Sequence, residues 1–446
     1  MKKIITSMLC ASLVLTVTAC GSSSKDAAVK DTPAPAKADP AKQVTLKLST
    51  WQTDAKAQWS KIIPEFEKKN PGIKVEVDLL NEKGDSVAAM QKLDLMAASN
   101  DQLDIIEMPS YMTYAQRATI GLLDPLESYM KKDGYEYEKE YIVNSSVNGK
   151  IFALPSSMQR WFVLLNKDAL DKAGLPVPKD WTWDQFTDYA KKLTTGEGAK
   201  KRYGAYLHNW PDLYKLQLMS KETDNHFLKV DGTSNALDPV LKSNLEMMKQ
   251  MMYTDKTVAP YEDIISQKLH YRTQFFNGAA AMVPIGDWMV VESGGTDAIP
   301  ATFKTAFAPI PKLAGATTHY SPTAPTYMGI AAKSKNKEAA YKFIRWYSSE
   351  GLEIGGRVFS GWAKSNMDTL IDKITSTSKD PSKIDMESLK YTMKNTKPST
   401  APAPTKFTSE MEKAVVGEVE LYLLNKQDIT KTMDSMNKKI EAILKK

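Results

Sequence analysis

The segment 44–79 constrains the fold most strongly, because its hydrophobic period changes twice. Apolar and polar side chains alternate over 44–48, apolar residues recur at helical spacing over 59–66, and alternation returns over 73–79. A strand, a helix and a second strand within about 36 residues is the length of a right-handed parallel crossover. The pattern therefore predicts an α/β layered domain.

The rest of the chain continues this alternation of strands and helices. Short apolar runs predict further strands at 105–106, 151–154, 162–165, 279–285 and 327–332. Helical spacing predicts helices at 87–98 and 429–444, and Thr182 with Gln185 has the spacing of a capping box that begins another. Asp104 is expected to act as a structural cap.

The N-terminus has the pattern of an export signal. A basic start at Lys2 and Lys3 is followed by an apolar stretch too short to span a membrane, so residues 1–19 are expected to be a signal peptide. Val17-Thr18-Ala19-Cys20 resembles the lipobox of bacterial lipoproteins, which implies that Cys20 carries lipid on the outer face of the cell membrane. Cleavage after Ala19 without lipidation is the alternative, and it would release a free secreted protein.

Residues 20–43 contain three prolines and no aromatic residue, so they are expected to form a flexible linker between the lipid and the folded body. The only cysteines are Cys10 and Cys20, which leaves the body without a disulfide. About 400 further residues predict two domains. The formal charge of +6 falls to +4 without Lys2 and Lys3, which is too small and too dispersed for a nucleic-acid footprint.

The sequence contains little that indicates catalysis. Its four histidines are far apart, and motifs for metal, phosphate or dinucleotide binding are missing, so no metal, cofactor or enzymatic activity is expected. Tryptophans instead follow several predicted strands, where open α/β sheets place their ligands. Aromatic faces stack on the apolar faces of sugar rings, although each such residue could also belong to a core.

Several stretches in order resemble the extracellular solute-binding proteins (family 1) of carbohydrate ATP-binding-cassette (ABC) importers, the group that includes maltose-binding protein. They are FEKKNPGIKVEV, LDIIEMPSYMTYAQRATIGLLDPL, GKIFALP with VLLNKDAL, AGLPVPKDWTWDQF, FFNGAAAMVPIGDW and GIAAKSKNKEAAYKFIRW. The resemblance implies a periplasmic-binding-protein-like type II fold, in which two α/β lobes joined by three chain crossings close on ligand by a hinge motion.

The same resemblance implies where the lobes begin and end. The expected first lobe is 44–155 with 287–330, and the expected second lobe is 156–286 with 331–446. The expected crossings are near 154–159, 282–287 and 328–332.

Position within the family also implies a ligand pocket. Its expected residues are Trp51, Gln52, Thr53, Met108, Tyr111, Gln159, Arg160, Trp161, Trp210, Asp287, Trp288, Tyr327 and Trp362. Met108 and Leu165 replace aromatic residues of relatives and Gln159 replaces a hinge carboxylate, which puts maltose in doubt. Arg160 and Asp287 could instead form an ion pair that closes the lobes.

These features together predict a monomeric, lipid-anchored receptor that captures a carbohydrate, an oligosaccharide above all, and delivers it to the permease subunits of an ABC importer. Two alternatives stay open. One is a binding protein for another solute, such as a phosphorylated glycerol compound or a polyamine. The other is a surface glycoside hydrolase, whose two carboxylates could have any spacing in the sequence.

Overall fold

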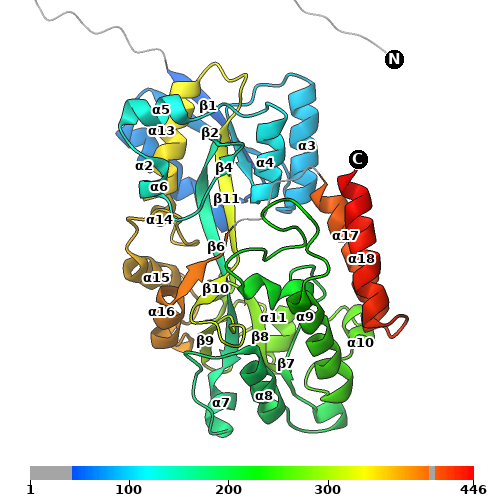
Figure 1. Cartoon of the computed structure of the whole chain (residues 1–446). Helices are drawn as coiled ribbons and strands as arrows, with labels where there is room; N and C mark the ends of the chain where they lie inside the picture. Colours follow the sequence, from blue (N-terminus) through cyan, green and yellow to red (C-terminus); the bar gives the residue numbers. More distant parts are fainter. Residues whose placement is uncertain (1–42, 401–406) are drawn as a thin grey trace, which may run out of the picture. The chain divides into compact units, whose positions relative to one another are not determined.

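The computed structural model describes residues 43–400 and 407–446, and a mixed sheet of eight strands runs through it (Figure 1). The expected signal peptide, Cys20 and all of the linker except Gln43 lie outside these residues. In spatial order the strands are β2 (Ile73–Leu79), β1 (Val44–Thr50), β3 (Ile105–Met108), β11 (Thr323–Ile330), β6 (Ala153–Asn166), β8 (Ala280–Gly286) and β7 (Tyr203–Ala205), while β9 (Thr305–Pro309) also pairs with β6.

Strand direction follows the connections. The crossover predicted over 44–79 is present: β1 is parallel to β2, with Val44 opposite Ile73. β3 is parallel to β1, and β11 runs antiparallel between β3 and β6. The α/β class predicted from hydrophobic periodicity is therefore confirmed.

Three clusters of buried side chains divide the described chain into two lobes. The first lobe has a core on each face of its strands, and neighbouring residues Ile105 and Ile106 enter different cores because side chains alternate along a strand. Its helices are α1 (Asp54–Ala57), α2 (Trp59–Lys69), α3 (Ser86–Ala98), α4 (Tyr111–Thr119), α5 (Glu127–Asp133), α6 (Tyr137–Glu140), α13 (Lys337–Trp346), the π-helical η5 (Tyr347–Gly351) and α14 (Leu352–Gly355). It also holds the short hairpin of β4 (Ser146–Val147) and β5 (Lys150–Ile151).

The second lobe has one large core around β6, β8 and β9. Its helices are α7 (Lys167–Lys172), α8 (Trp183–Leu193), α9 (Pro239–Lys249), α10 (Tyr261–Ser266), α11 (Tyr271–Phe276), α12 (Met289–Glu292), α15 (Met367–Ser376), α16 (Met386–Lys394), α17 (Thr408–Leu423) and α18 (Ile429–Leu444). Short helical turns are η1 (Gly198–Lys200), η2 (Leu213–Lys215), η3 (Leu218–Ser220), η4 (Gln250–Thr254) and η6 (Pro381–Lys383), and β10 (His319–Ser321) pairs with β12 (Thr396–Pro398).

Strand β6 is longer than the sequence pattern indicated. The runs 151–154 and 162–165 were expected as two strands, but β6 continues from Ala153 to Asn166 without a break. The polar residues between them pair with β11, whose Ala324 lies opposite Gln159. Figure 1 shows β6 and β11 passing from one lobe into the other, so the interruption in the hydrophobic pattern is itself a crossing.

The expected lobe boundaries differ from the grouping of the cores. Residues 287–310 were expected in the first lobe, yet β9 pairs with the second half of β6 and enters the second core. Helix α13 was expected in the second lobe, yet Phe343 and Ile344 pack in the first. β9 joins the second lobe because it pairs with β6, and α13 joins the first lobe because it packs against β11 and β1. In both cases contacts with strands distant in sequence decide which core a segment joins.

The third crossing also differs from the expected one near 282–287. Residues 282–286 of β8 pair with Trp161–Leu165 and stay in the second lobe. The chain returns instead through residues 353–366, between Leu352 in a core of the first lobe and Met367, which packs against the core of the second lobe. Within this return the Phe359 carbonyl accepts a hydrogen bond of 2.9 Å from the Met158 amide.

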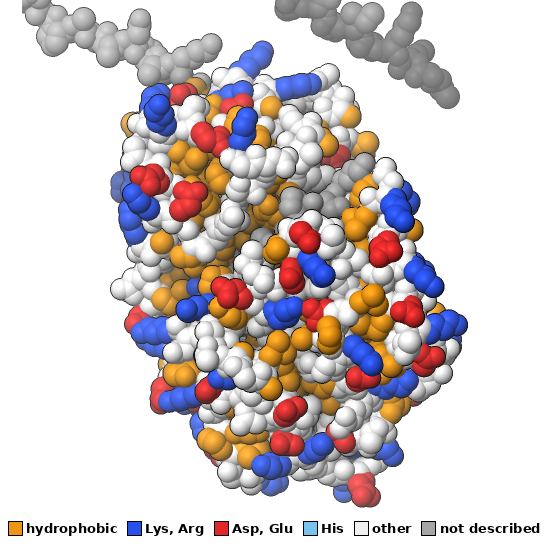
Figure 2. Space-filling model, viewed as in Figure 1, with side chains coloured by type: hydrophobic (Ala, Val, Ile, Leu, Met, Phe, Trp, Pro, Cys, Tyr) orange, Lys and Arg blue, Asp and Glu red, His pale blue; other side chains and the backbone are white. Residues whose placement is uncertain are grey.

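The surface carries both signs of charge. On the face shown in Figure 2, basic and acidic side chains are interspersed without one extended patch of either sign. Within 43–400 and 407–446, helices long and apolar enough to cross a membrane are not found.

Candidate functional site

A cavity of ≈ 390 Å³ lies where β6 and β11 cross between the lobes, and it is called the interlobe cavity below. Three expected ligand residues line it: Tyr111 and Tyr327 from the first lobe and Trp161 from the second. Pro322, Ala324 and Pro325 of β11 and the approach to it also line the cavity. The structure therefore brings together residues that are up to 216 positions apart in the sequence, from Tyr111 to Tyr327.

Strand pairing places Gln159 on the face of β6 that carries Trp161. Residues two apart share a face, and Ala324, which lines the cavity, is the cross-strand partner of Gln159. Gln159 is half-buried there. It is not among the lining residues, and its role in ligand binding stays a prediction.

The first lobe supplies a wall of tyrosines. Tyr327 is fully buried and stacks on Tyr114, with ring centroids 4.7 Å apart and planes 25° from parallel. Tyr111 begins α4, which Ser110 caps through a reciprocal hydrogen-bonded box with Thr113. The Tyr111 hydroxyl donates to the Ser146 carbonyl at 2.7 Å, so this wall is held in place from two sides.

The second lobe supplies a row of rings that starts at the cavity and is called the aromatic ladder. Its members in order are Trp161, Trp288, Trp210, Tyr271 and His270, with neighbouring ring centroids 5.7, 6.3, 5.1 and 4.2 Å apart. Since β7 and β8 are parallel, their carboxyl ends meet at one edge, from which Trp210 and Trp288 extend. An added Cβ at Gly286 would lie 1.9 Å from the Trp288 ring, so glycine is required there.

Asp287 and Arg160 lie beside the ladder but form no direct ion pair. The Asp287 carboxylate accepts a hydrogen bond of 2.9 Å from the backbone amide of Arg160, whose guanidinium donates to the Met393 carbonyl at 2.7 Å. Burial raises the pKa of Asp287 to about 7, while the hydrogen bond and the charge of Arg160 oppose the rise. The pair therefore connects β6, the end of β8 and α16.

Glu107 is a buried carboxylate that the sequence analysis missed. It lies on β3 and accepts hydrogen bonds from Thr50 at 2.5 Å, Gln52 at 2.7 Å and Ser156 at 3.2 Å. Burial raises its pKa to about 7, and these hydrogen bonds work against that rise. The signal was present as an acidic residue inside the apolar strand IIEM (105–108), a position that requires polar partners.

The hydrogen bonds of Glu107 extend onto both crossing strands. The Ser156 hydroxyl lies 2.8 Å from that of Thr326 on β11, which lies 2.6 Å from that of Ser157. Glu107, Gln52, Ser156, Ser157 and Thr326 are called the hinge network. The expected ligand residue Gln52 thus has its amide engaged with Glu107.

The other expected ligand residues lie outside the lining of the interlobe cavity. Met108 and Trp51 are buried in one of the two cores of the first lobe, and Thr53 precedes α1 without a side-chain cap hydrogen bond. Trp362 packs against the other core of the first lobe and donates to Glu140 at 3.0 Å. Their roles in ligand binding stay predictions.

Asp212, His226 and Asn144 also line the cavity, and the sequence analysis did not select them. Asp212 precedes the turn η2, and His226 lies in an irregular segment after η3. Neither position follows a regular strand, so sequence periodicity had no signal for them.

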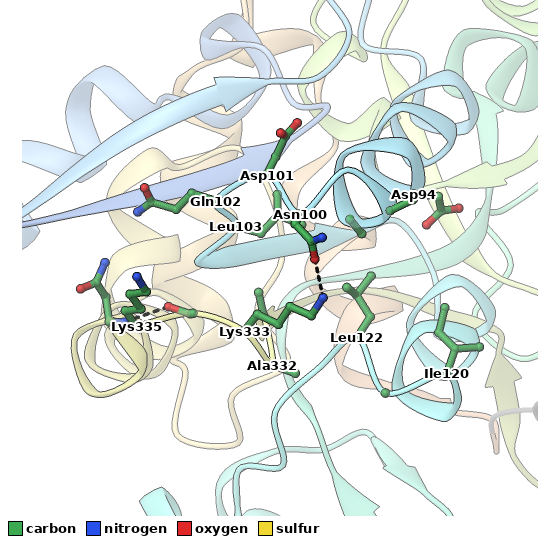
Figure 3. Close-up of a pocket in the computed structure, with 16 residues that line it drawn as sticks. Asp94, Asn100, Asp101, Gln102, Leu103, Ile120, Leu122, Ala332, Lys333 and Lys335 are labelled. Atoms are coloured by element: carbon green, nitrogen blue, oxygen red, sulfur yellow. Dashed lines mark hydrogen bonds between the residues drawn. The ribbon is translucent and has the colours of Figure 1, made fainter.

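A larger pocket of ≈ 690 Å³ lies at the opposite edge of the first-lobe strands. It is lined by the segment before β3 and by the one after β11, which meet because these strands are antiparallel. Figure 3 shows Lys333 reaching across it to Asn100, at 2.6 Å. Nearby Asp104 is buried and accepts from Lys47, Ser334 and Asn336, which confirms its structural role.

Among the described residues, clusters of three or more side chains suited to holding a metal ion are not found. The site consists instead of two α/β lobes, three crossings and an aromatic-walled cavity between them. These features define a two-lobed binding protein of the type II class.

The chain belongs to the bacterial extracellular solute-binding protein family, whose model matches residues 49–353. The multiple sugar-binding protein of Streptococcus mutans is 24% identical over 331 residues, which cover 69% of this chain and 71% of that protein. A binding protein of Brucella abortus is 24% identical over 222 residues, which cover 47% of this chain and 50% of that protein. The chain therefore spans about half the length of that relative.

Solved structures agree on the fold. The crystal structure of a sugar transporter from Rhizobium etli in an open conformation superimposes with a TM-score of 0.74 at 22% identity, covering 90% of this chain and 99% of that one. The predicted type II fold is therefore confirmed.

Proposed function

We propose that this protein captures a neutral carbohydrate, an oligosaccharide above all, in the interlobe cavity and delivers it to the membrane subunits of an ABC importer. In this proposal it acts outside the cytoplasm as a monomer, held on the membrane by lipid on Cys20. It binds its solute without altering it.

The character of the cavity lining carries the proposal. Aromatic side chains approach from both lobes, with Tyr111 and Tyr327 on one side and Trp161 on the other, while no Lys or Arg is among the described lining residues. Aromatic faces bind the apolar faces of sugar rings, and a few polar groups then fix orientation. The names of two relatives, a multiple sugar-binding protein and a sugar transporter, support the same solute class.

The lining disfavours the other solutes considered. A phosphorylated glycerol compound requires converging cationic or amide donors, and the described lining contains no cationic Lys or Arg. A polyamine requires several carboxylates, but Asp212 is the single acidic residue in that lining and already pairs with Lys215. Glycoside hydrolysis by the usual mechanism needs two facing carboxyl groups, and Asp212 is the single carboxylate among the described lining residues.

Isothermal titration calorimetry with neutral mono- and oligosaccharides tests the proposal. We expect one carbohydrate to bind and Trp161→Ala to weaken its binding by about tenfold or more. Trp183→Ala is a matched control, because Trp183 and Trp161 are both 5% exposed in the same lobe but Trp183 does not line the cavity. Binding of glycerol phosphates or polyamines in place of sugars, or release of reducing ends, would contradict the proposal.

Lipid attachment has a separate test. In the host cell, Cys20→Ala is expected to move the protein from the membrane fraction to the medium or periplasm and to abolish labelling by a palmitate analogue. Unchanged fractionation and labelling would exclude Cys20 as the anchor.

A further inference from the structure

One corner of the interlobe cavity is polar, and its residues come from the irregular part of the second lobe. Asp212 and His226 line the same cavity as Tyr111 and Tyr327 of the first lobe. The charge of Lys215 acts on both groups: it outweighs the effect of burial on the pKa of Asp212 and adds to the fall that burial causes in the pKa of His226.

The Asp212 carboxylate pairs with Lys215 through one oxygen and leaves the other oxygen available to a ligand. Its Oδ1 accepts from the Lys215 ammonium at 2.5 Å, and Oδ2 accepts no hydrogen bond from residues 43–400 or 407–446. The Asp212 side chain is 45% exposed, whereas that of Lys215 is 2% exposed. Burial tends to raise the pKa of Asp212, but Lys215 outweighs it and holds that pKa below its ordinary value.

His226 is neutral and has hydrogen-bonding capacity to spare. Burial, followed by the charge of Lys215, lowers its pKa to about 3. Within the described chain neither ring nitrogen makes a hydrogen bond, so the imidazole offers one donor and one acceptor. Its backbone is fixed, because Asn235 donates to the His226 carbonyl at 2.9 Å and Asn225 donates to the Thr400 carbonyl at 2.9 Å.

The charges around this corner exclude an anionic ligand. Lys215 is the nearest cation, but it is committed to Asp212 and shielded from the cavity. Glu412 of α17 also faces Lys215, and burial raises the pKa of Glu412. An ionised carboxylate and a neutral imidazole therefore meet the ligand, which favours hydroxyl groups over phosphates or carboxylates.

We infer that Asp212 and His226 form the specificity-determining pair of the cavity and bind neighbouring hydroxyl groups of one sugar ring. The Asp212 Oδ2 accepts from one hydroxyl, and the imidazole bonds the next as donor or acceptor. This inference rests on the proposed function, because it assigns recognition within the same cavity.

The test compares three variants against the carbohydrate identified by calorimetry. We expect His226→Phe to weaken binding by about ten- to a hundredfold, since it keeps a ring but removes both nitrogens. His226→Gln, which retains a donor and an acceptor, is expected to recover part of that loss. Asp212→Asn removes the charge and should weaken binding by about tenfold or more, whereas the exposed Asp231→Asn should have no effect.

Deoxy analogues of the same sugar separate recognition from a structural effect. If the pair reads hydroxyl groups, His226→Phe loses its effect on the analogue that lacks the recognised hydroxyl, while thermal unfolding of the free protein changes little. Equal weakening for every analogue, or a bound sugar whose affinity none of these variants changes, overturns the inference and leaves the proposed function intact. Failure of all neutral carbohydrates to bind overturns both.

Discussion

Glu107 in the first lobe and Asp287 in the second are both buried carboxylates near the carboxyl ends of strands. Burial raises the pKa of each to about 7. Their partners differ: Glu107 is bonded by three side chains, whereas a backbone amide bonds Asp287. The two lobes therefore stabilise a buried carboxylate in different ways, one with side-chain donors and the other with a backbone amide.

The difference shows what each carboxylate can respond to. The side-chain partners of Glu107 lead through the hinge network to both crossing strands, so its protonation is connected to the hinge. The partner of Asp287 is the backbone of β6, so this carboxylate fixes the junction of β6 with β8 from which Trp288 extends. Glu107 is therefore connected to the strands that cross between the lobes, and Asp287 is connected to the aromatic ladder.

The largest expected effect is the response of Asp287 to pH. Its pKa rises from 3.8 to about 7 on folding, so the native state keeps a proton that the unfolded chain has lost. The associated stability is complete below about pH 4 and is lost as pH rises to about 7, a change of about 4 kcal/mol. Denaturant unfolding of Asp287→Asn from pH 4.5 to 8 should therefore show a flatter profile, and a slope equal to wild type would refute this.

Glu107→Gln should flatten the profile less. The pKa of Glu107 rises from 4.5 to about 7, so its stability contribution is lost between about pH 4.5 and pH 7. The shift corresponds to about 3 kcal/mol. The same unfolding series measures it, and a flattening that exceeds that of Asp287→Asn would reverse the comparison.

Thr326→Val should break the hinge network without changing a titrating group. It removes the hydroxyl that bonds Ser156 and Ser157, and the expected cost is about 1–3 kcal/mol of unfolding free energy at every pH. Thr273→Val is the control, because Thr273 is exposed in α11 and its hydroxyl donates to the His270 carbonyl. An equal loss of unfolding free energy in both variants would show that the hinge network stabilises the fold no more than an exposed hydrogen bond does.

The smallest effect is expected at an exposed ion pair. Lys132 and Glu338 are 3.2 Å apart, with side chains 70% and 61% exposed. Lys132→Gln should change the unfolding free energy by less than about 0.5 kcal/mol, because water screens the pair. Calorimetric unfolding checks this, and a loss above about 1 kcal/mol would mean that exposed charges matter as much as buried ones.

Local patterns in the sequence were sufficient for much of the fold. Thr182 and Gln185 form the capping box that their spacing predicted, and the stripe over 429–444 forms α18. Such elements depend on neighbours within a few positions. The local patterns did not predict which lobe each segment joins, because β9 and α13 are placed by contacts with strands distant in sequence.

The candidate site was predictable only in part for the same reason. Trp161, Tyr111 and Tyr327 adjoin predicted strands and line the cavity. Asp212 and His226 reach it from irregular segments that have no period, and Glu107 is hidden in an apolar run. Residues at strand ends can be predicted from the neighbouring sequence, whereas the residues that meet them across the cavity depend on the complete fold.

The position of β11 has a consequence for folding kinetics. This strand lies between β3 and β6, although the chain makes it only at residues 323–330. A nascent chain that has not reached residue 330 cannot join the first-lobe strands to β6, so the sheet must wait for a contact of long sequence separation. Such topologies fold slowly, which gives the chain an extended period before its central strand closes the sheet.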